Sequence, residues 1–93
     1  MPRLLRLKIY GHVQGVGFRY EAMRKAQELG LVGFARNEKD HTVYIEAQGD
    51  DTTRLNEFLH WCTLHGPSGA RIERVESNYA NEPKSFVSFK VVS

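Results

Sequence analysis

The stretch from Gly11 to Arg19 constrains the fold most, because it separates a strand-like segment from a helix-like one. Before it, apolar and polar residues alternate from Leu5 to Tyr10, which is typical of a strand with one buried face. After it, apolar residues recur at helical spacing, namely Phe18, Ala22, Ala26 and Leu29. Gly30 then supplies the residue that ends such a helix. The sequence therefore predicts a strand-to-helix turn at this stretch.

The residue types in this turn indicate a site for an anion. Its glycines, at positions 11, 15 and 17, let the backbone adopt positive φ angles and approach a ligand closely. Unpaired backbone N–H groups that converge at a helix N-terminus form a concave donor site. Arg19 falls in the first helical turn, where the helix dipole disfavours a cation, so a role in helix stability is a poor explanation for it. Its guanidinium instead suits two oxygens of one phosphate or carboxylate.

The middle of the chain predicts a β-hairpin. Residues 32–37 and 42–47 both have strand character, with alternating apolar residues in the second segment. The connection between them is short and polar, so the two strands are expected to pair. Because this turn lacks a glycine, Asp40 or His41 is expected to accept a positive φ angle.

The second half of the chain predicts one helix and two strands. An Asp N-cap within residues 49–52 precedes a helix whose core positions follow helical spacing: Leu55, Phe58, Leu59 and Cys62. Residues 66–69 end this helix, and residues 70–76 read as a strand with a bulge or a sharp twist. We expect a loop over residues 77–85 and a short final strand over residues 86–92, at the edge of the sheet.

The predicted order is β-α-β-β-α-β plus a short terminal strand, which is the ferredoxin-like split βαβ arrangement of the α+β class. Two helices would cover one face of a mainly antiparallel sheet. The other face would stay partly open and carry Lys8, Tyr10 and Tyr44. At 93 residues, the chain is expected to form one domain over residues 1–93.

Composition excludes several classes of function and site. Thirteen Lys and Arg against 11 Asp and Glu give a net charge of +2, too mild by itself to indicate nucleic acid or membrane binding. A lone cysteine, Cys62, excludes an intramolecular disulfide. With no signal peptide or membrane-spanning run in the sequence, we expect a cytoplasmic protein. His60, Cys62 and His65 lack a second ligand cluster, so no zinc site is expected.

The glycine-rich stretch resembles the signature of the acylphosphatase family, G-x-V-Q-G-V-x-F-R, at every fixed position from Gly11 to Arg19. The family's second segment, G-x-x-x-N, matches residues 33–37, although Phe34 stands where tryptophan is common. A G-P-x-x-A element at residues 66–70 and a late F-x-x-F-x-V beginning at Phe86 extend the resemblance over nearly the whole chain.

This resemblance implies an enzyme that hydrolyses an acyl phosphate to a carboxylate and inorganic phosphate, without a metal or other cofactor. Arg19 and Asn37 would be the catalytic residues, with Asn37 orienting the attacking water. The phosphate would lie on a backbone loop made of Gln14, Gly15, Val16, Gly17, Phe18 and Arg19. We expect this enzyme to act as a monomer, with no nucleic acid or membrane partner.

Two other readings stay open from the sequence. The same fold serves RNA-binding modules that stack bases on aromatic residues of the open sheet face, where Tyr10 and Tyr44 are expected. The basic segment rich in glycine and aromatic residues that such modules carry is absent. Alternatively, the chain is similar to acylphosphatase-like domains of larger maturation proteins, which bind a carbamoyl-phosphate-like ligand. His12, beside the expected phosphate loop, could tune the pH dependence of that site without acting as a base.

Overall fold

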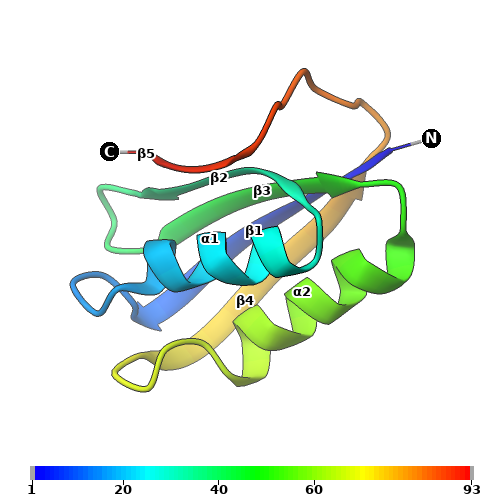
Figure 1. The fold of residues 1–93 in the computed structure, drawn as a ribbon. Helices are drawn as coiled ribbons and strands as arrows, with labels where there is room; N and C mark the ends of the chain where they lie inside the picture. The colour runs from blue at the N-terminus through cyan, green and yellow to red at the C-terminus, as the bar shows by residue number, and fades with distance from the viewer. Residues whose placement is uncertain (1, 93) are drawn as a thin grey trace.

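The computed structural model describes residues 2–92, which form a five-stranded sheet with two helices on one of its faces (Figure 1). In chain order the elements are β1 (Arg3–His12), α1 (Phe18–Glu28), β2 (Val32–Asn37), β3 (Val43–Gly49), α2 (Thr52–Leu64), β4 (Arg71–Ala80) and β5 (Phe89–Val92). The strand order is β4-β1-β3-β2-β5, and every neighbouring pair is antiparallel except β2 and β5. The predicted α+β, ferredoxin-like arrangement is confirmed.

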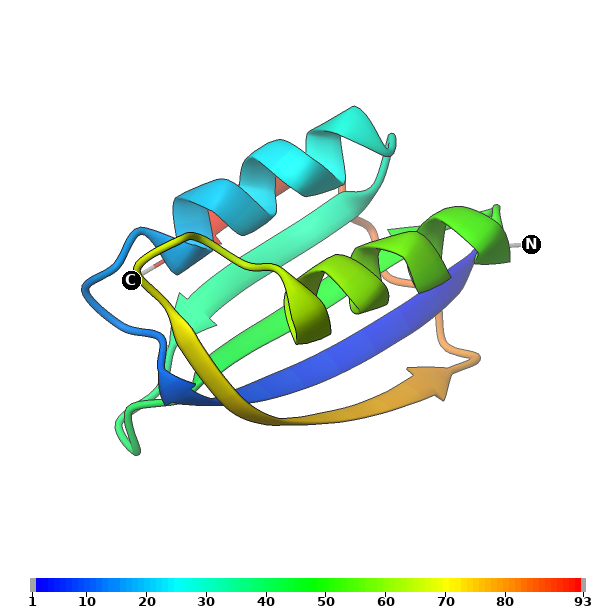
Figure 2. The ribbon, with the colours of Figure 1, turned by 90° about the horizontal axis from the view of Figure 1, so that it is seen from below.

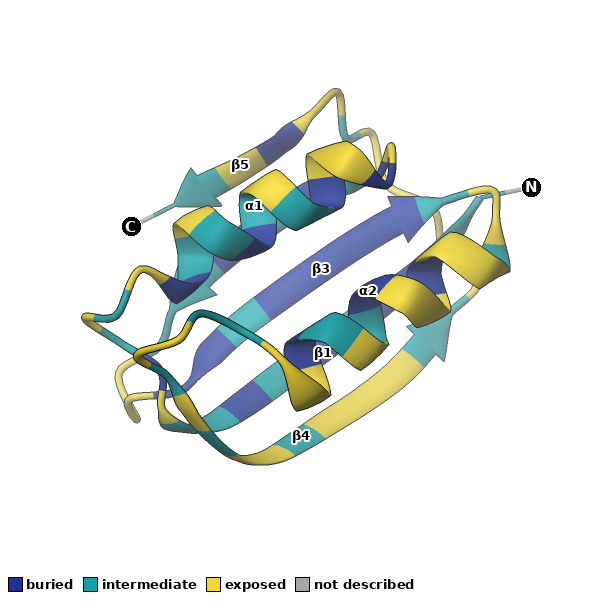
Figure 3. Cartoon of the chain, turned by 60° about the horizontal axis from the view of Figure 1, so that its bottom comes forward, coloured by how far each residue is buried: buried dark blue, intermediate teal, exposed yellow. Residues whose placement is uncertain are grey.

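The core lies between the sheet and the helix layer, and α1 and α2 run side by side over it (Figure 2). Alternate residues of the central strands β1 and β3 face the helices and are fully buried, as the predicted alternation requires (Figure 3). The helices contribute Phe18, Ala22, Ala26, Leu55, Phe58 and Cys62. Burial raises the pKa of the Cys62 thiol well above its ordinary value, so this cysteine is an inert core residue. Neither helix within residues 2–92 is long and apolar enough to cross a membrane.

The turn between β2 and β3 contains a residue with a positive φ angle although it has no glycine. His41 takes the positive φ angle, 71°, as one of the two residues expected to do so. Asp40 stabilises this turn by accepting hydrogen bonds from the Thr42 hydroxyl and from the Thr42 N–H. These bonds, together with a 2.9 Å ion pair to Lys8, lower the pKa of Asp40 well below its ordinary value.

Two predicted boundaries near the C-terminus were wrong. The strand expected over residues 70–76 continues to Ala80, because β4 pairs with β1 along nearly its whole length despite its polar sequence. The register shift opposite Tyr10 and Gly11 confirms the bulge. The last strand begins only at Phe89, since residues 86–88 cross the open face of the sheet before reaching its edge.

The segment between β4 and β5 is fixed to this open face by polar contacts. The Gln48 side chain donates to the carbonyl of Lys84 at 2.9 Å and accepts from its N–H at 2.8 Å. The Lys84 ammonium forms a 2.8 Å ion pair with Glu46, which is buried. Burial disfavours the charged form of Glu46, but the hydrogen bonds from Lys84 and Tyr44 outweigh it, and the pKa of Glu46 is lowered. The segment therefore lies against the open face of the sheet and covers part of it.

Candidate active site

The loop between β1 and α1 presents its backbone N–H groups without protein partners. Within the described chain, no N–H from residue 14 to residue 19 donates a hydrogen bond to a protein acceptor. Gly15 and Gly17 have φ angles of 76° and 78°, and a Cβ added at either would meet no atom within 4 Å. These glycines therefore serve the loop's backbone conformation, and the space before them is open to a ligand.

The N-terminus of α1 adds to this donor set. Gly17 is its N-cap and offers no side chain to the first-turn N–H groups. In most helices a Ser, Thr, Asp or Asn side chain accepts from one of these groups. Here they remain available, and the partial positive charge of the helix end favours an anion at the same place.

Arg19 lies at the same end of the molecule, half-buried in the first turn of α1. Its Nη1 donates to the carbonyl oxygen of Val92 in β5 at 2.9 Å. Among residues 2–92, no carboxylate forms an ion pair with Arg19. The guanidinium is thus oriented by one backbone contact and keeps its charge and its other donors for a ligand.

Asn37 is the last residue of β2, and its carboxamide lies on the helix side of the sheet, opposite Val43. Its Oδ1 atom is buried, and no donor in the described part of the chain reaches it. A buried acceptor without a partner costs roughly 1–3 kcal/mol and calls for an explanation. An ordered water or a ligand atom at this position would supply the missing donor.

The Gln14 side chain ties the loop to the hairpin that carries Asn37. Its Nε2 donates to the carbonyl oxygens of Glu38 and Thr42, at 2.8 and 2.9 Å. Glu38 directly follows Asn37, and Val92, which holds Arg19, pairs with Arg36 on the other side. The loop, the guanidinium and the carboxamide therefore meet at the C-terminal end of β2.

This set of groups suits phosphate chemistry without a protein-bound metal. Backbone N–H groups and one guanidinium can neutralise phosphoryl oxygens, and a carboxamide can hold a water. No group of three or more His, Cys, Asp or Glu side chains that could hold a metal ion occurs in residues 2–92. The rings of His60 and His65 lie 6.2 Å apart, within α2 and directly after it.

Comparison with known proteins gives the family. Residues 5–91 match the family model for acylphosphatase. An acylphosphatase of Mannheimia succiniciproducens is 46% identical over 83 residues, covering 89% of this chain and 90% of the relative. The chain belongs to the acylphosphatase family. The chain is therefore an acylphosphatase, which is a hydrolase.

Solved structures agree with the acylphosphatase assignment. The crystal structure of acylphosphatase from Bacillus subtilis superposes with a TM-score of 0.92 at 26% identity, covering 98% of this chain and 99% of that one. Full-length HypF in its phosphate- and nucleotide-bound form gives a TM-score of 0.90 at 29% identity. It matches all of this chain but only 12% of its own length. The acylphosphatase fold thus occurs both in small proteins and as a part of larger ones.

The structure brings Arg19, Asn37 and the loop together at one rim of the acylphosphatase fold, and it also shows a role of the Gln14 side chain that the sequence did not predict. Only the Gln14 backbone was expected to take part. The signal was present, because glutamine is not a residue that a glycine-rich turn needs for its conformation. Its two acceptors, however, lie 24 and 28 residues away in sequence, so spacing alone could not find them.

Replacing Gln14 by alanine is expected to lower kcat for an acyl phosphate by about tenfold, because the loop loses its fixed position relative to Asn37. Loss of two hydrogen bonds should also lower the free energy of unfolding by about 1–3 kcal/mol. Gln14→Glu keeps the shape but not the donor and should be equally impaired. Steady-state kinetics and thermal unfolding measure both effects, with Gln27→Ala on α1 as the matched control. Full activity in Gln14→Glu would exclude the two hydrogen bonds as the cause.

Proposed function

We propose that this chain hydrolyses acyl phosphates by in-line attack of a water that Asn37 orients. The phosphoryl group would lie on the backbone N–H groups of residues 14–19, with the Arg19 guanidinium on its oxygens. The observation that carries the proposal is the meeting of these donors with a buried, unpartnered carboxamide oxygen at one end of β2. All of these groups come from one chain, so the reaction requires no second copy.

The reaction needs little help with its leaving group. The water oxygen bonds to phosphorus while the bond between phosphorus and the acyl oxygen breaks, and the electron pair leaves with the carboxylate. The water supplies two protons to the phosphate product, so an acyl phosphate dianion and water give a carboxylate and dihydrogen phosphate. A carboxylate is a weak base, and no general acid is required for its departure.

Catalysis then depends on position and charge. The phosphoryl group carries negative charge on its non-bridging oxygens throughout the reaction, and preorganised donors stabilise that charge without reorganising. The open loop amides, the N-terminus of α1 and Arg19 supply such donors. Asn37 Oδ1 accepts a hydrogen bond from the water, which fixes the direction of its attack and removes the unfavourable burial of that oxygen.

The test is hydrolysis of benzoyl phosphate in the presence of a chelator. We expect undiminished release of inorganic phosphate with EDTA present, and competitive inhibition by added inorganic phosphate, because protein donors alone hold the phosphoryl group. A metal-dependent phosphatase assayed in the same buffer shows that chelation is complete. Saturable binding of benzoyl phosphate without phosphate release would point to a binding domain. Turnover that EDTA abolishes and a divalent cation restores would refute the mechanism.

A further inference from the structure

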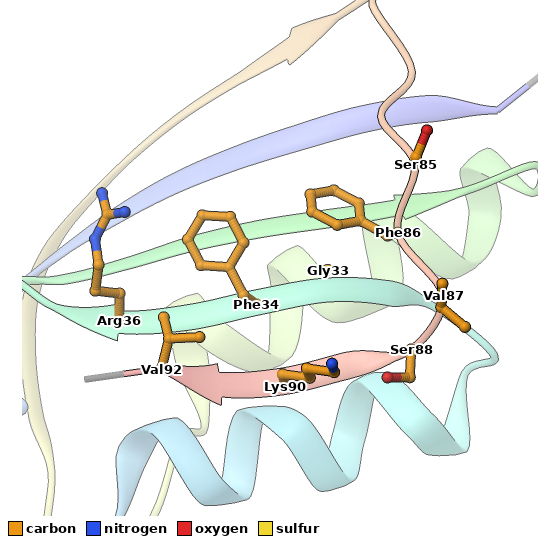
Figure 4. Close-up of a pocket in the computed structure, with 9 residues that line it drawn as sticks. All are labelled: Gly33, Phe34, Arg36, Ser85, Phe86, Val87, Ser88, Lys90 and Val92. Atoms are coloured by element: carbon orange, nitrogen blue, oxygen red, sulfur yellow. The ribbon is translucent and has the colours of Figure 1, made fainter.

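A cleft of about 400 Å³ lies on the open face of the sheet, over β2 and β5 (Figure 4). Its volume falls within the range of small-molecule sites, about 300–1,000 Å³. Phe34 and Phe86 meet edge to face, with ring centroids 6.0 Å apart, and Val87 is 92% exposed at its margin. A contiguous apolar patch of this kind often marks a ligand-binding or interaction site.

One end of this cleft adjoins the proposed catalytic groups. Arg36 and Val92 line it there and are paired across β2 and β5. The carbonyl of Val92 holds the Arg19 guanidinium at 2.9 Å, and Asn37 directly follows Arg36. Phe34 lies two residues back on the same face, roughly 7 Å along the strand. A group attached to a phosphate on the loop therefore has a short route over the end of the sheet into the cleft.

The walls select a flat, apolar group. The Arg36 guanidinium lies 5.4 Å from the ring centroid of Phe34 and 5.1 Å from that of Tyr44, beside the aromatic rings of this face. Its charge is paired with that of Glu38 at 2.9 Å, so the cation beside the aromatic rings has little attraction left for an anionic group. A second cation, Lys90 of β5, also lines the cleft. An aromatic ring can pack against Phe34 and Phe86 while Arg36 covers one side.

We propose that this cleft binds the acyl group of the substrate, and that the preferred substrates are acyl phosphates with an aromatic acyl group. The inference rests on the proposed function, since it assigns the second half of the same substrate. The phosphoryl half contacts the loop and Arg19 alone, so the two halves contribute separately to binding.

The test compares two substrates in the same variants: benzoyl phosphate, whose ring would enter the cleft, and acetyl phosphate, whose methyl group would end short of Phe34. We expect Phe86→Ala and Phe34→Leu to lower kcat/KM for benzoyl phosphate by roughly five- to tenfold. The change for acetyl phosphate should stay below about twofold, because the phosphate site is untouched. Thermal unfolding monitored by circular dichroism shows that each variant is folded before its kinetics are compared.

Tyr10→Ala is the matched control, because Tyr10 is an aromatic residue of the same open face that does not line the cleft. It should leave the ratio of the two kcat/KM values unchanged. A parallel loss for both substrates in the Phe86 and Phe34 variants, an unchanged ratio, or an equal shift in Tyr10→Ala would each overturn the acyl subsite. Failure of the wild type to hydrolyse either substrate would instead overturn the proposed function.

A titration with benzoate, the product carboxylate, tests the cleft without turnover. Saturable chemical-shift changes at Phe34, Phe86 and Val87, weakened in Phe86→Ala, are expected. No saturable change at these residues, or changes spread equally over the open face at Tyr10, would contradict the assignment.

Discussion

Arg19→Ala is expected to lower kcat/KM for acyl phosphates by at least about 10². The guanidinium is the only full positive charge that the proposal places on the phosphoryl oxygens, and its loss leaves the backbone N–H groups alone to stabilise them. Steady-state hydrolysis of benzoyl phosphate measures the effect. Inhibition by inorganic phosphate should weaken as well, because Arg19 also contacts the ground-state phosphate.

The fold should survive this change. Arg19→Ala loses one hydrogen bond, to the Val92 carbonyl. It also removes a cation from the N-terminal turn of α1, where the helix dipole disfavours positive charge. The two effects oppose each other, so the free energy of unfolding should change by no more than about 1 kcal/mol. Thermal unfolding monitored by circular dichroism checks this.

Arg24→Ala is the matched control for Arg19→Ala. Arg24 lies five positions on in the same helix, with 71% of its side chain exposed and an ion pair to Glu21. It should keep full activity. Arg19→Lys should remain impaired, since an ammonium cannot bond two phosphoryl oxygens as a planar guanidinium does. Wild-type turnover in Arg19→Ala would mean that the loop alone holds the phosphate.

The sequence predicted most of the fold because its strongest patterns are local. Alternation over residues 5–10 and helical spacing after Phe18 correctly placed β1, α1 and their buried faces. The bounds of β2, Val32–Asn37, were predicted correctly. The polar end of β4 was missed because its strand conformation comes from pairing with β1, not from its own residues. Phe86 was placed in a strand by its apolar character, whereas its ring packs on Phe34.

The same distinction between local sequence patterns and long-range contacts applies to the candidate site. The glycine pattern and Arg19 are contiguous in sequence, so their roles could be expected from residue types alone. The contact from Arg19 to Val92 joins residues 73 apart, and the contacts of Gln14 reach the hairpin. Those long-range contacts decide how precisely the loop faces Asn37, and only the folded chain contains them.

Asn37→Ala is expected to lower kcat for benzoyl phosphate by about 10². Without the carboxamide, the water is no longer held in line with the leaving carboxylate, and most encounters have the wrong geometry. KM and the inhibition constant for inorganic phosphate should change little, because Asn37 holds the water and not the phosphoryl group. This division between kcat and KM separates it from Arg19→Ala, which should affect both.

A measurement of stability distinguishes a catalytic role of Asn37 from a structural one. The Oδ1 atom is buried and has no partner among residues 2–92, so removing it relieves a desolvation cost, and Asn37→Ala should be as stable as the wild type or more stable. Asn81→Ala, an exposed asparagine in the segment before β5, should change neither stability nor activity. A residue kept for structure would show the reverse, with lower stability and preserved kcat. Undiminished kcat in Asn37→Ala would mean that another group holds the water.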